Sequence, residues 1–224
     1  MTRKILHFVL GFLIFACVAF SQQTVTYGSS VKLHSLANGR KFYLAAVSMQ
    51  WHGRPQDHDI VSAMSDETRA EVYWNIISSS SDNSRLSAEP VLCGAYVRFR
   101  QAVSGKHLHS ERTLKAPLSG LTDVAAAGSD SPDSDFLVDC KSPVWLMNQP
   151  VTLKHRSTGG YLGTSADLEF TQYNCPRCPM IGDLEVSLSE ENRGRGWIVS
   201  GGVIIHELKD ASPNDPEEQF RDEL

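Results

Sequence analysis

The fold is decided by a short pattern that occurs in three places: Val31-Lys32-Leu33-His34, Val97-Arg98-Phe99-Arg100 and Val151-Thr152-Leu153-Lys154. Each stretch alternates apolar with polar residues, which is the period of a half-buried β-strand. A glycine follows the second apolar residue of each copy by six positions, at Gly39, Gly105 and Gly159. The chain then becomes apolar or aromatic again, so each copy predicts a β-hairpin.

A second alternating strand follows each hairpin, after a polar stretch that contains glycine and serine. Each of these strands carries a large aromatic residue, Trp74, Phe136 or Trp197, which lies 43, 39 or 46 residues beyond the first strand of its copy. One hairpin pair cannot bury its apolar face alone, whereas several copies can share a core. The pattern therefore predicts one closed, threefold, all-β domain. Helical periodicity is weak and is visible only at residues 66–71 and in the C-terminal tail.

The apolar positions of these strands are predicted to form the core and to define the fold. We interpret their aromatic residues as core residues rather than as a ligand site, and we extend this to Trp145 and Tyr161. The predicted core residues are Val31, Leu33, Trp74, Val97, Phe99, Phe136, Val151, Leu153 and Trp197.

The two ends of the chain carry targeting signals. Residues 1–21 have a basic start, a short apolar run and small residues at a cleavage point after Ser21, which indicates a signal peptide. The chain ends with Arg221, Asp222, Glu223 and Leu224, which resembles the KDEL and HDEL signals that a retrieval receptor binds. Together these ends predict retention in the lumen of the endoplasmic reticulum (ER).

The charge of the chain argues against nucleic-acid binding. Residues 207–224 form an acidic tail with seven acidic and two basic residues, a net charge of -5. The signal peptide carries +2, so the total of -5 leaves residues 22–206 at -2. A domain so close to neutral has no basic field for phosphate groups. Nothing in residues 22–206 is long and apolar enough to predict a membrane span.

Common catalytic signatures are absent from the sequence, so we expect a protein that is not an enzyme and has no cofactor. His107 and His109 lie on one face of a predicted strand, but no third metal ligand is evident, and we expect a hydrogen-bonded surface pair. Asp130, Asp133 and Asp135 lie in a polar loop that is expected to stay solvated rather than to bind calcium.

Four cysteines remain after removal of the signal peptide, an even number that suggests disulfides in an oxidising lumen. Cys175 and Cys178 form a Cys-x-x-Cys motif beside Arg177. A local structural disulfide is the favoured interpretation, because redox motifs of this kind normally begin a helix and this one lies in a β repeat. Catalytic thiol–disulfide exchange and free or intermolecular thiols remain alternatives.

The repeats resemble the MIR motif, and the whole chain resembles the stromal cell-derived factor 2 family. The resemblance rests on four segments and on the C-terminal signal; the segments are Val25-Thr26-Tyr27-Gly28, Tyr73-Trp74, Lys106-His107-Leu108-His109-Ser110 and Pro117-Leu118-Ser119-Gly120. It implies a β-trefoil of three MIR repeats, at residues 22–78, 85–140 and 141–206. It also implies a role in protein quality control beside the lumenal chaperone BiP and a J-domain co-chaperone.

This sequence departs from the family pattern in each repeat. Phe42-Tyr43-Leu44-Ala45 stands where family members usually have Leu-His-Ser-His, so a ligand role tied to that motif is not transferred. Phe136 replaces the usual tryptophan of the second repeat, and Cys175-Pro176-Arg177-Cys178 is not a family feature. The trefoil interpretation brings Cys93 and Cys140 to one end of the second repeat and predicts a disulfide worth about 4 kcal/mol.

The leading functional hypothesis is a non-enzymatic accessory subunit of an ER chaperone complex, which contacts its partner through exposed loops. One alternative is a carbohydrate-binding module that binds a glycan or a glycoprotein, because trefoils often carry a shallow pocket in each repeat. A second alternative is thiol–disulfide exchange through Cys175 and Cys178.

Overall fold

The structure is a computed structural model that describes residues 22–37, 39–49, 55–82, 84–128, 130–191 and 196–207. The predicted signal peptide and the C-terminal tetrapeptide lie outside the described residues, as does all of the acidic tail beyond residue 207.

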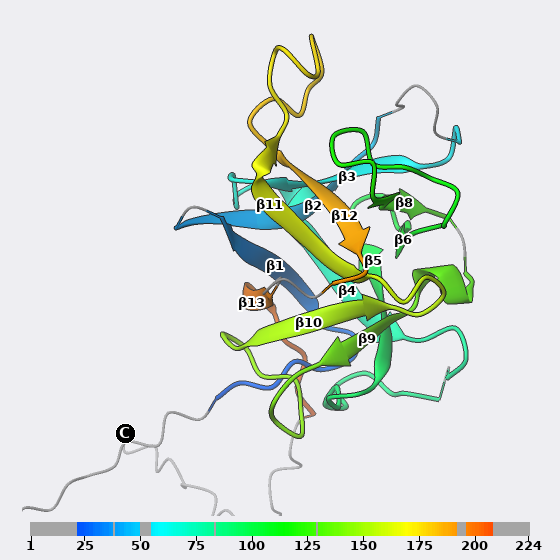
Figure 1. Cartoon of the computed structure of the whole chain (residues 1–224). Helices are drawn as coiled ribbons and strands as arrows, with labels where there is room; N and C mark the ends of the chain where they lie inside the picture. Colours follow the sequence, from blue (N-terminus) through cyan, green and yellow to red (C-terminus); the bar gives the residue numbers. More distant parts are fainter. Residues whose placement is uncertain are drawn as a thin grey trace, which may run out of the picture.

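The described residues form an all-β domain with two single-turn 3₁₀ helices (Figure 1). In chain order the elements are β1 Ser30–Ala37, β2 Arg40–Val47, β3 Asp59–Met64, η1 Ala70–Val72, β4 Tyr73–Ser78, β5 Tyr96–Gln101, β6 His107–His109, β7 Thr122–Asp123, β8 Ala125–Ala127, η2 Pro132–Ser134, β9 Phe136–Asp139, β10 Pro150–His155, β11 Tyr161–Glu169, β12 Leu184–Ser189 and β13 Trp197–Val203.

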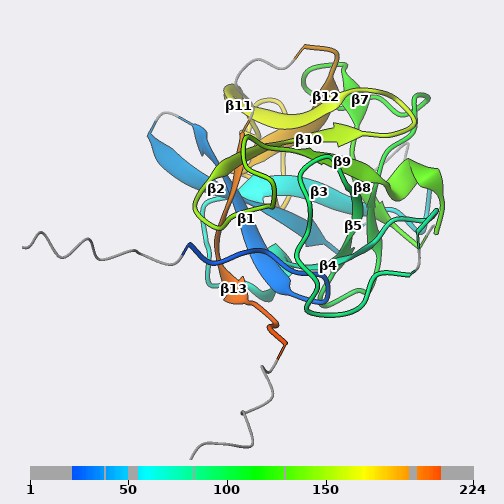
Figure 2. The same ribbon diagram turned by 90° about the horizontal axis from the view of Figure 1, so that it is seen from below.

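Six of the described strands close into a ring of antiparallel neighbours. β1 pairs with β4, β4 with β5, β5 with β9, β9 with β10, β10 with β13, and β13 with β1. A closed ring has no free edge, so its backbone groups are not exposed to pairing with another chain. Figure 2 shows these strands around a common interior.

The remaining strands cover one end of this ring. The pairs β2–β3 and β11–β12 and the three-stranded unit β6–β8–β3 extend from it, and β12 joins them by pairing with β3 and β7. The expected hairpins are present as the antiparallel pairs β1–β2, β5–β6 and β10–β11. The backbone φ angles of Gly39, Gly105 and Gly159 are 74°, 72° and 74°. This left-handed conformation favours glycine, which accounts for the glycine in each copy of the pattern.

The main core lies inside the ring and under its covering strands. All nine residues that the sequence assigns to the core belong to it, and none is more than 2 % exposed. Trp145 is also fully buried there. Tyr161 is only partly buried, so its assignment to the core was wrong. The Lys154 ammonium lies 5.3 Å from the centre of its ring.

Two strands, β3 and β12, fall in stretches that the sequence analysis treats as polar connections. Every residue of both strands is buried. Val61 and Ala63 of β3 face the main core, whereas Ile60 belongs to a second, smaller apolar cluster. β3 shows no apolar alternation, because a strand that is covered on both faces hides its period, whereas β12 alternates in polarity and was missed in the sequence.

The weak helical periodicity at residues 66–71 corresponds to no more than the 3₁₀ turn η1, Ala70–Val72. Its buried residue, Val72, packs with Tyr43, Ala45 and Met64 in a third small apolar cluster. β4 begins immediately afterwards, which leaves no room for a longer helix.

The two ends of the described chain lie side by side. Thr26 Oγ1 donates a hydrogen bond of 2.6 Å to the carbonyl oxygen of Ile205, and the amide of Ile205 donates to Ser29 Oγ at 3.1 Å. The side chains of Gln23 and His206 are also within hydrogen-bond distance, at 3.1 Å. The last described residues therefore lie next to the first residues that follow the predicted signal peptide.

Candidate functional site

The segment between β11 and β12, residues 170–183, projects from the body of the domain and contains the Cys-x-x-Cys motif. We call it the cysteine loop; it includes the yellow loop at the top of Figure 1. The structure joins Cys175 and Cys178 in a disulfide within this loop.

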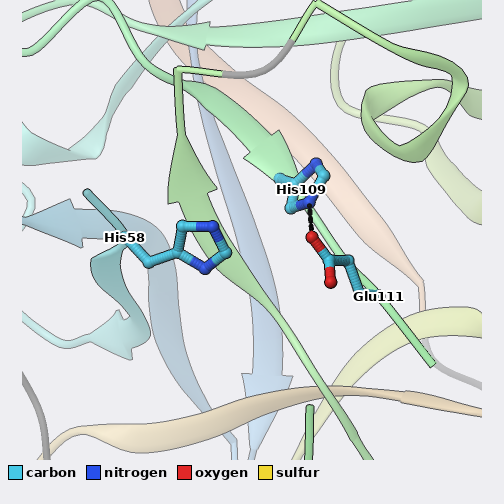
Figure 3. Close-up of side chains that lie close together, drawn as sticks. All are labelled: His58, His109 and Glu111. Atoms are coloured by element: carbon cyan, nitrogen blue, oxygen red, sulfur yellow. Dashed lines mark hydrogen bonds and ion pairs between the residues drawn. The ribbon is translucent and has the colours of Figure 1, made fainter. Parts of the chain in front are cut away.

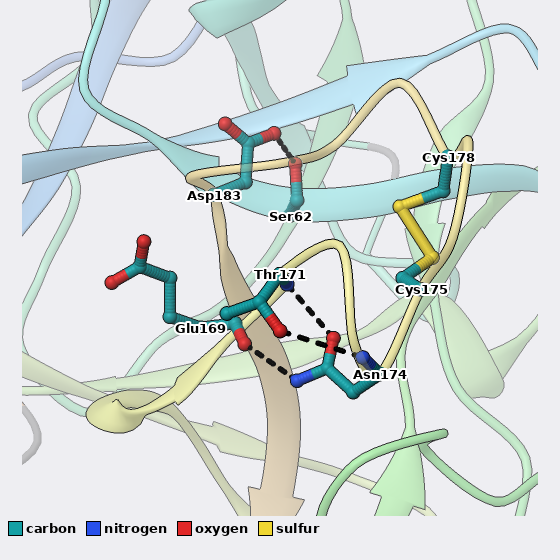
Figure 4. The surroundings of a disulfide bond; sticks show 7 residues. All are labelled: Ser62, Glu169, Thr171, Asn174, Cys175, Cys178 and Asp183. Atoms are coloured by element: carbon teal, nitrogen blue, oxygen red, sulfur yellow. Dashed lines mark hydrogen bonds between the residues drawn. A yellow bond between two sulfur atoms is a disulfide. The ribbon is translucent and has the colours of Figure 1, made fainter.

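Hydrogen bonds hold the base of the cysteine loop in one conformation. The amide of Phe170 donates to the carbonyl of Asp183 at 2.9 Å, and the amide of Gly182 donates back to Phe170 at 2.8 Å. Nearer the tip, Asn174 Oδ1 accepts from the amide of Thr171 at 2.8 Å, and Asn174 Nδ2 donates to the carbonyl of Glu169 at 2.9 Å (Figure 4). The loop is therefore bonded to itself at both its base and its tip.

A small apolar cluster fixes the loop on the outer face of β3. It contains Ile60, Phe170, Cys175 and Met180, which are all at least nine-tenths buried, with Cys178 packed against them. Cysteines buried in apolar surroundings are generally structural and unreactive. The motif also lies in turns rather than at a helix start, so this environment favours a structural bridge over disulfide exchange.

Tyr173 lies in this anchored loop with its side chain 99 % exposed. We did not single out this residue from the sequence. A lone aromatic among polar residues beside a cysteine pair could have indicated an exposed contact residue. An aromatic ring offers a large contact area with few rotatable bonds, which is why tyrosine is frequent at the centres of protein interfaces.

A hollow of about 150 Å³ lies beside the cysteine loop, between its C-terminal half and the end of β3. Its lining mixes apolar and charged groups, namely Val47, Met64, Ser65, Asp66, Arg69, Pro179, Met180 and Asp183. The volume is below that of a pocket for a drug-sized ligand, which starts at roughly 300 Å³. The hollow is better suited to one side chain of a partner protein than to a cofactor.

Asp183 gives this hollow an unusual acidic group. Burial raises the pKa of its carboxyl from 3.8 to about 6, against the lowering effects of a hydrogen bond from Ser62 and the charge of Arg69. The Ser62 hydroxyl donates to Asp183 Oδ2 at 2.8 Å (Figure 4). The sequence did not indicate this residue, because its environment depends on strands far apart in the chain.

The second pair of cysteines closes a larger loop. Cys93 and Cys140 are joined in a disulfide across a sequence separation of 47 residues, with their Cα atoms 5.5 Å apart. The bridge ties the segment before β5 to the end of β9, and these two strands are neighbours in the ring. It lies apart from the cysteine loop and belongs to the body of the domain.

The expectation that His107 and His109 form a surface pair was wrong, because His109 is buried. His109 is buried and lies with His58 and Glu111, whereas His107 is only partly buried and is not part of that group. His58, from the segment before β3, had no role in the sequence analysis. Its position beside His109 depends on strand pairing that the sequence pattern does not reveal.

Two of the three aspartates of the polar loop, Asp130 and Asp135, pair with arginine side chains. Asp135 is fully buried, so the expectation that it stays solvated was wrong. Its carboxylate accepts from the amide of Ser80 at 2.8 Å and pairs with Arg156 at 3.0 Å. Asp130 pairs with Arg98, and the carbonyl of Asp133 accepts from His155 Nε2 at 2.8 Å. These contacts tie the loop to its neighbours.

No protein-family model matches the chain. It is 27 % identical to human stromal cell-derived factor 2 over 202 residues, which cover 88 % of this chain and 90 % of that protein. It is 28 % identical to mouse stromal cell-derived factor 2-like protein 1 over 192 residues, 84 % of this chain and 81 % of the relative. The resemblance to the stromal cell-derived factor 2 family is confirmed.

A solved structure has the same fold. The SDF2-like protein from Arabidopsis thaliana superimposes with a TM-score of 0.71 at 23 % identity, covering 82 % of this chain and 98 % of that one. Within the described residues, no helix is long and apolar enough to span a membrane.

Proposed function

We propose that this chain is a non-enzymatic accessory subunit of an ER chaperone complex, which binds BiP or its J-domain co-chaperone stoichiometrically. The observation that carries the proposal is the similarity to stromal cell-derived factor 2, which extends over nearly the full length of both chains. The terminal Arg221-Asp222-Glu223-Leu224 supports the ER lumen as the compartment, because a KDEL-type retrieval receptor binds signals of this kind.

The proposed architecture is a β-trefoil of three MIR repeats at residues 22–78, 85–140 and 141–206. The closed ring and the glycine conformations at Gly39, Gly105 and Gly159 support it, because each hairpin turns with the same backbone geometry. The disulfide between Cys93 and Cys140 then lies within the second repeat. A trefoil presents its loops on a rigid body, which suits a protein that acts by binding.

The proposed contact surface is the tip of the cysteine loop together with the adjacent hollow. Tyr173 supplies an exposed aromatic ring on an anchored loop, and the hollow can receive one side chain of the partner. Little conformational freedom is lost when a loop that is already held by hydrogen bonds and a disulfide binds a partner.

The test is a titration of purified BiP and of a lumenal J-domain protein against the mature chain, residues 22–224, by calorimetry. We expect one complex of defined stoichiometry, and at least about tenfold weaker binding by Tyr173→Ala, the loss typical of an interface hot spot. Val103→Ala is the matched control, because Val103 is also an exposed apolar residue in a turn. Equal binding by both variants would remove the cysteine loop from the interface.

A second part of the experiment tests whether the domain or the acidic tail binds the partner. The domain carries a charge of -2 and the tail -5, so binding through the domain should vary weakly with salt and survive removal of residues 207–224. Loss of binding on removal of the tail would assign the contact to the tail instead. If neither chaperone binds while a defined glycan does, the protein is a carbohydrate-binding module.

A further inference from the structure

Three side chains that can ligate a metal converge where β3, β8 and β6 lie side by side. His58, His109 and Glu111 each offer one ligand atom, and these atoms lie within 4.8 Å of one another. Both histidines are buried and Glu111 is exposed. The two imidazole rings are 5.6 Å apart between centroids and nearly perpendicular, at 70° (Figure 3).

Strand pairing explains why these residues meet. β8 lies between β3 and β6, with Ala125 paired to Ile60 on one side and to His109 on the other. His58 immediately precedes β3, so it lies diagonally across β8 from His109. β8 consists of Ala125–Ala127, and its small side chains leave room for two rings to approach across it. Glu111 follows His109 by two residues and completes the group.

A hydrogen bond orients the His109 ring toward this group. His109 Nδ1 lies 3.3 Å from the hydroxyl of Ser134, which is buried in η2. When Nδ1–H donates to Ser134, the lone pair is on Nε2, which faces Glu111 Oε1 at 3.1 Å. A metal ion between Nε2 and Oε1 would satisfy both acceptor atoms of this tautomer, whereas in the other tautomer Nε2–H donates to Glu111 directly. Bonds from the outer nitrogen of a metal-bound histidine commonly fix its tautomer in this way.

The donor set favours one class of metal. Two imidazoles and one carboxylate bind Zn²⁺ and related transition metals, whereas Ca²⁺ and Mg²⁺ prefer oxygen ligands throughout. Lys106, the residue before β6, pairs with Asp59 at 2.7 Å, so its positive charge is already balanced. The exposure of Glu111 leaves a path from solvent and room for a water ligand.

We propose that His58, His109 and Glu111 form a Zn²⁺ site with three protein ligands and an open fourth position. The site joins the segment before β3 to the end of β6, so a bound ion would link two hairpins of the domain. It is independent of the proposed partner contact, since the cysteine loop contributes none of the three ligands.

The test is a Zn²⁺ titration of the untagged mature chain, residues 22–224, against a chromogenic chelator, without reductant so that the disulfides stay closed. We expect one strongly bound ion per chain, and at least about tenfold weaker binding by His58→Gln and by His109→Gln. Substitution with Co²⁺ should give the visible absorption of a tetrahedral site. His107→Gln is the matched control and should bind as the parent does.

Glu111→Gln keeps the proposal testable if a histidine variant fails to fold, because Glu111 is exposed and its replacement leaves the core intact. It should weaken Zn²⁺ binding while circular dichroism and thermal unfolding without metal stay unchanged. Absence of a stoichiometric ion in the parent would overturn the site. So would Zn²⁺ affinity that is equal in the parent and Glu111→Gln, or that falls as much in His107→Gln as in His58→Gln.

Discussion

The indole nitrogen of Trp74 donates a hydrogen bond of 2.9 Å to the carbonyl oxygen of Leu44 inside the core. Trp197 makes the corresponding bond to Leu162 at 3.0 Å. Each tryptophan follows a hairpin of the repeated pattern, and each acceptor lies in the second strand of that hairpin. The bonds therefore tie β4 to β2 and β13 to β11. Phe136 takes the corresponding place after the second hairpin and has no such donor, although it is fully buried.

These bonds predict that Trp74→Phe and Trp197→Phe each lower the free energy of unfolding by about 2 kcal/mol. Each change removes a hydrogen bond and leaves a buried carbonyl oxygen without that donor. The measurement is chemical denaturation followed by fluorescence or circular dichroism.

Trp145→Phe is the matched control for this pair. Trp145 is also fully buried, but its indole nitrogen has no hydrogen-bond partner within the described part of the chain. Its replacement removes an unsatisfied donor, so the loss should be smaller than at Trp74 or Trp197. A larger loss at Trp145 would mean that packing, and not the two indole bonds, decides the cost.

Asp183 predicts a stability that depends on pH in a defined direction. Its pKa is raised from 3.8 to about 6 in the folded protein, so the folded state holds the proton more tightly than the unfolded state. Ionisation between about pH 4 and pH 6 therefore favours unfolding, and the contribution of Asp183 to stability falls as the pH rises through this window. Asp183→Asn cannot ionise, and its amide oxygen can still accept from Ser62.

We expect Asp183→Asn to be more stable than the parent by about 1–2 kcal/mol at pH 7, allowing for partial solvent exposure, and equal to it below about pH 4. Denaturation curves at several pH values measure the difference. A stabilisation that is the same at pH 4 and pH 7 would show that ionisation of Asp183 is not its cause.

The two disulfides should differ in their effect on stability. Cys93 and Cys140 close a loop with a separation of 47 residues, whereas Cys175 and Cys178 are separated by 3. In the chain-entropy model, loss of the longer bridge costs about 4 kcal/mol and loss of the shorter one about 2 kcal/mol. The double serine variant of each pair, compared by thermal unfolding, measures this order.

The cysteine-loop variant has a second readout. Limited proteolysis of Cys175→Ser/Cys178→Ser should show faster cleavage within residues 170–183, since one constraint on this projecting loop is lost. The Cys93→Ser/Cys140→Ser variant should not share that local change at temperatures where it stays folded. Insulin reduction by the parent protein at rates above background would contradict a purely structural bridge.

Strands with one buried face were the easiest to predict from the sequence. Strands with one buried face, such as β1 and β5, alternate in polarity and could be identified, and so could the inward position of Phe136. β3 is buried on both faces and gave no alternating signal, whereas β12 alternates in polarity but stands outside the repeated pattern and was missed. The turn glycines were visible because a positive φ restricts the residue type.

The candidate sites were less visible for a different reason. Cys175 and Cys178 form a local motif, but the raised pKa of Asp183 depends on burial beside β3. His58 and His109 meet only because β8 pairs with strands on both sides. Such contacts depend on topology, and residue spacing along the chain does not encode them.

Retention in the ER is predicted from the last four residues. Deletion of residues 221–224 should release the protein into the culture medium, because the retrieval receptor no longer binds it. The deletion should not disturb folding, since the chain leaves the domain at Ile205 and His206, beside Thr26 and Gln23. Immunoblots of cells and medium measure the distribution, and thermal unfolding of the secreted form checks its fold.

The matched control is an extension of the full chain by two glycines after Leu224, which leaves every native residue in place but hides the terminal carboxylate. The extended protein should be secreted like the deleted one, because the signal acts only at the chain terminus. If both proteins fold and yet stay in cells that secrete normally, binding to a resident partner holds them there. The Tyr173→Ala variant without residues 221–224 then decides whether that partner contacts the cysteine loop, since its release would identify the loop as the point of attachment.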